Sequence, residues 1–308
     1  MSTRLALQLL HGLFVLLPLA VQFPLAHLLG SAGFYLLRRR RHIAKVNIAL
    51  CLPELDATRQ RRLLQDNFRA TARGIVELAI SWWASDDTVR RLSRLEGREL
   101  LVAARQQQRG VLLIGAHYTS IDLAGRLIGL HEDLDITYKR QRNPVFDSYL
   151  RQRRQRSFRH LIEKNDMRQM IRQLQAGRTV WFAPDQDFGR KGSVFAPFFH
   201  RDAATIGNIG RILSLTGARP LFYSHFRETG HDGKAVYVGR ISDPFHDGFG
   251  DDAVANATLL NQAIADVIRQ HPEQYLWVHE RFRTQPEPGM AKPYRLRKKK
   301  HRATKEAS

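Results

Sequence analysis

The most distinctive pattern in the chain is an uncharged apolar run near its amino end. Residues 5–37 contain no Asp, Glu, Lys or Arg, and a helix of about 20 such residues is long enough to cross the hydrocarbon core of a bilayer. Pro18 and Pro24 predict a kink or a hairpin within the run. Four consecutive arginines, Arg38 to Arg41, follow it.

The placement of charge favours a membrane anchor over two alternatives. A cleaved signal peptide carries its positive charge before the apolar stretch, whereas here only Arg4 precedes it and four arginines follow. A core helix of a soluble domain is shorter and has a polar face. We therefore predict that residues 1–41 are a membrane anchor with a basic stop. The cationic cluster predicts that the rest of the chain lies on the cytoplasmic side of the membrane.

Downstream of this run, apolar stretches of strand length alternate with patterns of helical spacing. The predicted strands cover residues 111–116, 136–138, 179–183, 220–226 and 235–241. The predicted helices cover residues 59–84, 120–129, 145–156, 166–176, 203–215 and 252–270. Such alternation is typical of an α/β fold, a layered sheet flanked by helices on both faces. We expect residues 42–288 to form this domain.

Composition and charge limit the possible partners. The chain has 308 residues, 43% of them hydrophobic, and a single cysteine, Cys51, which excludes a disulfide scaffold. The formal charge is +20, so we expect an anionic partner. Residues 139–159 and residues 289–308 each hold eight Lys or Arg and one acidic residue. The second of these segments is polar, and we predict that it is a disordered basic tail.

A histidine and an aspartate lie where a buried strand gives way to a helix. His117 directly follows the strand predicted at 111–116, and Asp122 comes five positions later. Ligands in open α/β sheets bind beyond the carboxyl ends of strands. A carboxylate bonded to one ring nitrogen would let the imidazole take a proton from a hydroxyl that attacks an acyl carbonyl. The same spacing recurs at His246 and Asp251, but in a glycine-rich loop that we interpret as a turn.

The segment around His117 resembles the His-x4-Asp/Glu signature of glycerolipid-type acyltransferases. Three further blocks resemble the late lipid A acyltransferases, the lauroyl and myristoyl transferases, in the order and spacing of that family. These blocks are YKRQRNP with RRQRS, APDQDFGRKGSVFAPFF with AATIGNIGRILSLTGARP, and HPEQYLWVHERFRTQP. The resemblance covers residues 5–288. It implies an O-acyltransferase that moves a fatty acyl chain from acyl carrier protein, or from coenzyme A, to a hydroxyl of a lipid A precursor as a secondary acylation. It also implies an anchor at the cytoplasmic face of the inner membrane, and a reaction with no metal and no cofactor.

The resemblance also implies roles for individual residues. The family's general base matches His117, and the acid that orients it matches Asp122. The family's arginine matches Arg154, with Arg156 beside it, and the Asp of the Pro-Asp-Gln block matches Asp185. We expect Asp185 to orient an arginine or the substrate.

The basic residues around that arginine suit an anionic acceptor. A lipid A precursor carries phosphates and sugar-acid carboxylates, which arginine side chains bind through two parallel hydrogen bonds. We therefore expect Lys139 and Arg142 to contribute to acceptor binding. The alternating segment Tyr275-x-Trp277-x-His279-x-Arg281 predicts an extended stretch near the site, in which Tyr275 and Trp277 pack.

Three residues depart from the family pattern, and one of them, Asp122, keeps an alternative acceptor open. Asp122 stands where the lipid A enzymes usually carry Glu, Arg140 where they often have Pro, and His200 where they often have Gly. The same chemistry on a glycerolipid, ornithine lipid or glycolipid therefore stays open. A membrane-tethered nucleic-acid-binding protein would also explain the charge, but no helix-turn-helix, RNA-recognition or basic-zipper pattern occurs. A hydrolase is disfavoured because no G-x-S-x-G is present.

Overall fold

A seven-stranded sheet forms the centre of the protein in the computed structural model, which describes residues 3–230 and 235–295. Its strands are β1 (Ser93–Glu96), β2 (Val111–Gly115), β3 (Leu134–Tyr138), β4 (Leu161–Glu163), β5 (Thr179–Phe182), β8 (Arg219–Thr229) and β9 (Ala235–Ser242). They lie in the order β1-β9-β8-β2-β5-β3-β4, and every neighbouring pair is parallel except β8 and β9. A separate antiparallel hairpin joins β6 (Ser193–Phe198) to β7 (Arg201–Ile206).

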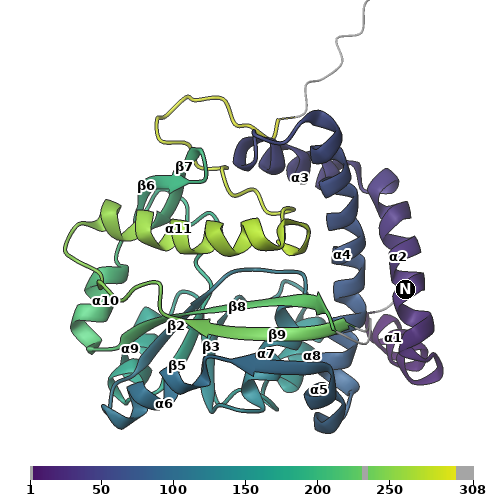
Figure 1. The fold of residues 1–308 in the computed structure, drawn as a ribbon, viewed down its shortest axis with the longest axis horizontal. Coiled ribbons are helices and arrows are strands. Elements are labelled where there is room, and N and C mark those ends of the chain that lie inside the picture. Colours follow the sequence, from purple (N-terminus) through teal and green to yellow (C-terminus); the bar gives the residue numbers. More distant parts are fainter. Residues whose placement is uncertain (1–2, 231–234, 296–308) are drawn as a thin grey trace, which may run out of the picture.

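Helices cover both faces of this sheet. The helices of the described chain are α1 (Thr3–Leu16), α2 (Leu19–Leu36), α3 (Arg38–Cys51), α4 (Ala57–Trp83), α5 (Asp86–Leu92), α6 (Arg98–Gln106), α7 (Ile121–Gly129), α8 (Pro144–Arg154), α9 (Met167–Gln175), α10 (Ile209–Thr216) and α11 (Ala253–Gln270), of which α1, α2 and α3 pack against other helices rather than on the sheet. Figure 1 shows α11 above the sheet and α6 below it. The expected α/β fold is therefore confirmed.

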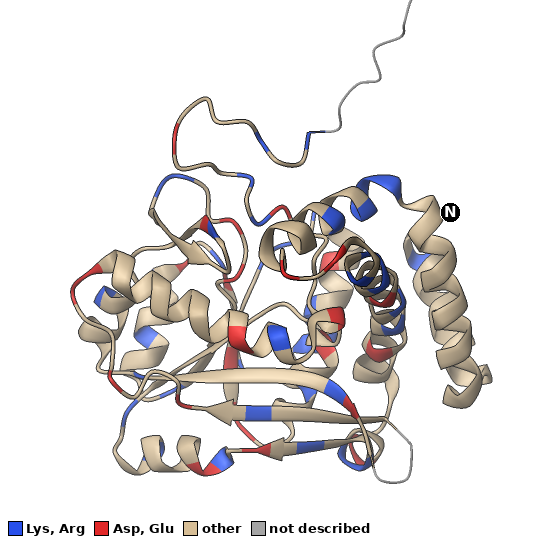
Figure 2. Ribbon diagram, turned by 45° about the horizontal axis from the view of Figure 1, so that its top comes forward, with Lys and Arg blue, Asp and Glu red and all other residues tan. Residues whose placement is uncertain are grey.

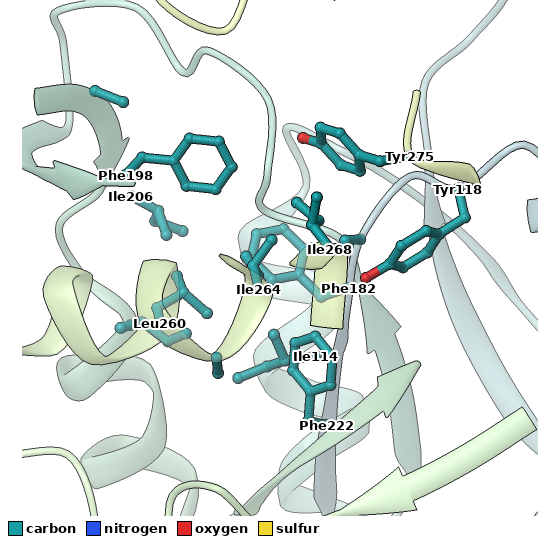
Figure 3. Close-up of a cluster of buried hydrophobic side chains, with 14 of the residues drawn as sticks. Ile114, Tyr118, Phe182, Phe198, Ile206, Phe222, Leu260, Ile264, Ile268 and Tyr275 are labelled. Carbon is teal, nitrogen blue, oxygen red and sulfur yellow. The ribbon is translucent and has the colours of Figure 1, made fainter. Parts of the chain in front are cut away.

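Successive side chains of β2 point to opposite faces of the sheet and pack into two separate hydrophobic layers. Leu112 and Ile114 face the layer of α9, α10 and α11, where Ile114 lies among residues such as Ile264 (Figure 3). Leu113 faces the other layer with Ile128 of α7. Burial of each such side chain contributes about 1.5–3 kcal/mol. Because β2 is buried on both faces, its register with the neighbouring strands is fixed. The residues that directly follow β2 are therefore held at a defined position at the edge of the sheet.

The amino-terminal run forms two helices rather than one. Pro18 separates α1 from α2, while Pro24 lies inside α2. Within the described residues, α2 alone is long and apolar enough to cross a membrane. It packs against α4 at Gly30, where an added Cβ would lie 2.6 Å from the Cα of Arg69. Its outer face exposes large apolar side chains such as Leu28.

Most of the predicted elements are confirmed, but one is wrong. The helix predicted over 203–215 is in fact a strand that ends at Ile206, followed by α10. The apolar residues before Ile206 pair with β6 across a tight turn in which Phe199 has a φ of 56°. No glycine marks that turn, so the sequence gives no hairpin signal there. The predicted basic tail lies mostly outside the described residues.

Two asparagines fasten the extended segment after α11 to the amino-terminal helices. Asn47 of α3 donates to the carbonyl oxygens of Trp277 and His279, at 2.6 and 2.7 Å. Asn67 of α4 donates to the carbonyl oxygen of Tyr275 at 2.7 Å. Both asparagines are buried. The segment that carries Tyr275 is therefore held by the same helices that support α2.

Candidate active site

His117 and Asp185 meet at one edge of the sheet. β2 and β5 are parallel neighbours, so His117, two residues beyond β2, and Asp185, three residues beyond β5, leave the sheet side by side. The ring nitrogen Nδ1 of His117 lies 2.6 Å from Oδ1 of Asp185. The backbone N–H of His117 donates to Oδ2 at 3.0 Å, and the hydroxyl of Tyr275 donates to the same oxygen at 3.0 Å. Asp185 is thus fixed by three hydrogen bonds.

This pairing sets the protonation of the histidine. Burial lowers the pKa of His117 most strongly, but the charge of Asp185 and its hydrogen bond together raise the pKa above the ordinary value of 6.5. Burial opposes ionisation of Asp185, yet the contact with His117 holds the pKa of that carboxyl well below its usual range. Because ionised Asp185 can only accept, Nδ1 carries a proton and Nε2 is left as an acceptor. The His117 side chain is 26% exposed and that of Asp185 only 1%.

The structure places the expected partner of His117 elsewhere. Asp122 lies in the first turn of α7, and its Oδ1 accepts from Nε and Nη2 of Arg154 at 2.9 and 2.7 Å. Asp185 contacts Nδ1 of His117 because β5, which precedes Asp185, is the neighbour of β2 in the sheet. Asp122 instead faces the end of α8. Asp122 still acts on His117 through its charge, which raises the pKa of the histidine, while Arg154 lowers it.

The predicted acceptor-binding residues divide into two groups. Lys139 and Arg142 lie exposed in the loop after β3, at the same carboxyl edge as His117. Arg156 lies in the connection that leads into β4, where it lines an open hollow of about 450 Å³ with residues 129–133. Those residues precede β3, so the hollow is at the amino ends of the strands. The structure therefore brings Arg154 to the site and does not bring Arg156.

Three residues of this region received no catalytic interpretation from the sequence. Tyr275, expected only to pack, donates to Asp185. The ring of His279 lies 5.8 Å from that of His117, and burial followed by the charge of His117 lowers the pKa of His279 to about 4. His225 of β8 is buried, and its Nδ1 lies 3.2 Å from the hydroxyl of Ser120. For Tyr275 and His279, the alternating pattern of residues 275–281 was the signal in the sequence that could have indicated a role at the site.

The arrangement combines a histidine base with nearby fixed cations. Nε2 of His117 can accept a proton, and Asp185 can stabilise the imidazolium that results. Arg154, held by Asp122, supplies donors for an anion. In the described part of the chain, no group of three or more His, Cys, Asp or Glu residues is arranged to hold a metal ion.

Comparison with known proteins identifies the family. A model described as bacterial lipid A biosynthesis acyltransferase matches residues 5–284. The lipid A biosynthesis palmitoleoyltransferase of Escherichia coli (strain K12) is 36% identical over 275 residues, which cover 89% of each chain. The lauroyltransferase of the same strain is 32% identical over 280 residues, again 89% of each chain. The myristoyltransferase is 25% identical over 277 residues, which cover 88% of this chain and 84% of the relative.

These matches define the protein as an acyltransferase enzyme. The chain belongs to the bacterial lipid A biosynthesis acyltransferase family. Together with α2, this membership indicates a membrane-associated protein.

Proposed function

We propose that the protein moves a fatty acyl chain from acyl carrier protein to a hydroxyl of a lipid A precursor, as a secondary acylation. Family membership and the names of the relatives support the acyl transfer and the acceptor. Residues 42–288 form the catalytic domain in this proposal. Residues 1–41 are its anchor at the cytoplasmic face of the inner membrane, and residues 289–308 are a basic tail.

The hydrogen bond of 2.6 Å between His117 and Asp185 carries the proposed mechanism. Nε2 of His117 takes the proton from the acceptor hydroxyl while its oxygen attacks the thioester carbonyl carbon. The tetrahedral intermediate collapses, the carbon–sulfur bond breaks, and the carrier thiolate takes the proton from the imidazolium. Asp185 orients the ring and stabilises its charged form throughout. The free enzyme is restored without an external reductant or oxidant.

Arg154 is the proposed acceptor-binding arginine, and Asp122 positions it. Both bonds between them end on Oδ1 of Asp122 and use Nε and Nη2 of Arg154. Nη1 of the guanidinium therefore stays available for a phosphate or carboxylate of the acceptor. Lys139 and Arg142 add positive charge at the same edge of the sheet. Asp122 in this proposal acts through Arg154 rather than through the ring of His117.

Positive charge beside the anchor suits an acidic carrier protein as the donor. Figure 2 shows Lys and Arg gathered on α3 and α4, which pack against α2, a helix without a charged residue. The residues are Arg38, Arg39, Arg40, Arg41 and Lys45 of α3, and Arg59, Arg61 and Arg62 of α4. Charge complementarity of this kind raises the rate of encounter between partners.

A paired substitution tests the mechanism. The chain contains a second His–Asp pair, in which Nδ1 of His160 lies 2.9 Å from Oδ1 of Asp135, ahead of β4. His117→Ala should lower turnover at least ~10²-fold, as expected for loss of a general base. His160→Ala, a matched control, should leave turnover unchanged. Mass spectrometry of the acylated precursor reads out activity and acyl chain together, and near-normal turnover of His117→Ala would refute the mechanism.

A further inference from the structure

A cavity of about 560 Å³ lies between α1, the end of α4 and α8. Its lining includes Arg4, Gln8 and His11 from α1, and Tyr149 and Arg153 from α8. None of the described residues that line it is acidic. The described lining therefore carries two positively charged residues, Arg4 and Arg153, and no negative one.

The lining contains an unused hydrogen-bond donor. The hydroxyl oxygen of Tyr149 accepts from Nε1 of Trp83 and from Nη2 of Arg153, both at 2.9 Å. A phenolic oxygen has two lone pairs and one proton, so these two bonds leave the proton for an acceptor. A phenolic proton beside two positively charged residues, with no acidic side chain in the described lining, fits an anionic group with several oxygens, such as a phosphate.

The outer side of α1, next to this cavity, exposes an apolar stripe that suits a membrane surface. Leu5, Leu9 and Leu13 are large exposed apolar residues at helical spacing of four. Arg4, which lines the cavity together with Gln8, lies on a different stripe of the same helix. One side of α1 can therefore enter lipid while the other closes the cavity.

The helix α8 connects the cavity to the active site. Arg153 lines the cavity, whereas its neighbour Arg154 turns to Asp122 beside His117. Consecutive residues of a helix point about 100° apart, so α8 presents one arginine to each place. A phosphorylated glycolipid that rises from the bilayer can thus contact both.

We propose that this cavity binds a phosphate of the glycolipid acceptor while the acceptor hydroxyl lies at His117. The inference rests on the proposed function, because it takes the lipid A precursor as the substrate. It adds a second anion subsite, built by Arg4, Tyr149 and Arg153, to the one at Arg154. The subsite anchors the acceptor and takes no part in the chemical step.

Arg4→Gln tests the subsite, since Arg4 is exposed and its loss leaves the helix intact. With the intact precursor in detergent micelles, we expect KM to rise about tenfold and kcat to stay within about twofold, as for loss of one charge-assisted hydrogen bond. With the same precursor after phosphatase treatment, the variant and the wild type should be indistinguishable. Arg4→Glu should give a larger rise in KM on the intact precursor. Arg172→Gln, an exposed arginine of α9 outside the cavity, is the matched control.

Several outcomes would overturn the subsite. An unchanged KM for Arg4→Gln on the intact precursor would do so, as would an equal loss on both precursors. Flotation with vesicles of phosphatidylcholine, with and without phosphatidylglycerol, provides a separate arm. If Arg4→Gln selectively lost attachment to the phosphatidylglycerol vesicles, the cavity would serve a bilayer phospholipid and not the acceptor. A wild-type enzyme that fails to acylate the precursor would refute the proposed function, and the subsite would fall with it.

Discussion

Replacing Asp185 with Asn removes the charge that faces the ring of His117 and keeps the size of the side chain. A hydrogen bond to a charged group contributes about 1.5–3 kcal/mol. Since roughly 1.4 kcal/mol corresponds to a factor of ten in rate, kcat should fall by about 10- to 100-fold. The bond at 2.6 Å is short and its acceptor is buried, so we expect the upper part of that range.

The pH profile distinguishes this effect from a general loss of structure. His117 acts as a base only when neutral, so wild-type kcat should fall as the pH drops through the raised pKa of His117, above 6.5. Without the charge of Asp185, burial dominates and lowers that pKa, so the acidic limb of Asp185→Asn should move to lower pH. Asp252→Asn is the control, because Asp252 caps α11 and Asn caps helices equally well. An unshifted limb with near-normal kcat in Asp185→Asn would refute the reasoning.

The remaining predictions concern the acceptor, the membrane and the helix packing. Asp122→Asn should raise the KM for the acceptor more than it lowers kcat, because the arginine it holds is released; a loss confined to kcat would return Asp122 to the role of orienting the histidine. Leu28→Lys should weaken vesicle flotation, whereas Leu215→Lys, an equally apolar exposed site on α10, should not; equal flotation of both would place the membrane contact elsewhere. Gly30→Ala should lower the melting temperature in detergent, because its Cβ would overlap α4, while Gly12→Ala meets nothing within 4 Å and should stabilise α1 by up to about 1 kcal/mol; the reverse order would contradict the packing described.

The position of His117 could be predicted because its signal is local. Five buried apolar residues form β2, and the polar residues that follow begin a loop and then α7. A strand buried on both faces and a helix start are both read from a short stretch of sequence. The sequence therefore placed His117 correctly at the end of a strand.

The contact between His117 and Asp185 could not be predicted in the same way. It depends on the order of the strands, in which β5 lies between β2 and β3 although β3 comes first in the chain. Which parallel strands become neighbours depends on how whole layers of helices and strands pack, so the strand order cannot be predicted from a single segment of sequence. The nearer candidate, Asp122, has the shorter separation along the chain but pairs with Arg154 across two helices. Family resemblance singled out Asp185, and only the fold showed what it holds.

The hairpin of β6 and β7 was missed for a related reason. Ala203 to Ile206 (AATI) form a short stretch that fits either a helix or a strand. Pairing with β6, in which Ser193 lies opposite Ile206, determines that these residues form a strand. Propensity over four residues is weaker than a complete ladder of backbone hydrogen bonds.

The hydrogen bonds of Asn47 and Asn67 bear on any attempt to obtain a water-soluble form of this enzyme. Both side chains belong to the helices that follow α2, and they hold the backbone around Tyr275, whose hydroxyl fixes Asp185. Cutting away α1 and α2 would uncover the side of α4 against which Gly30 lies. Inhibitor screening should therefore use the full-length enzyme in detergent or nanodiscs, since removal of α1 and α2 would expose a face of the helix whose Asn67 holds the backbone at Tyr275.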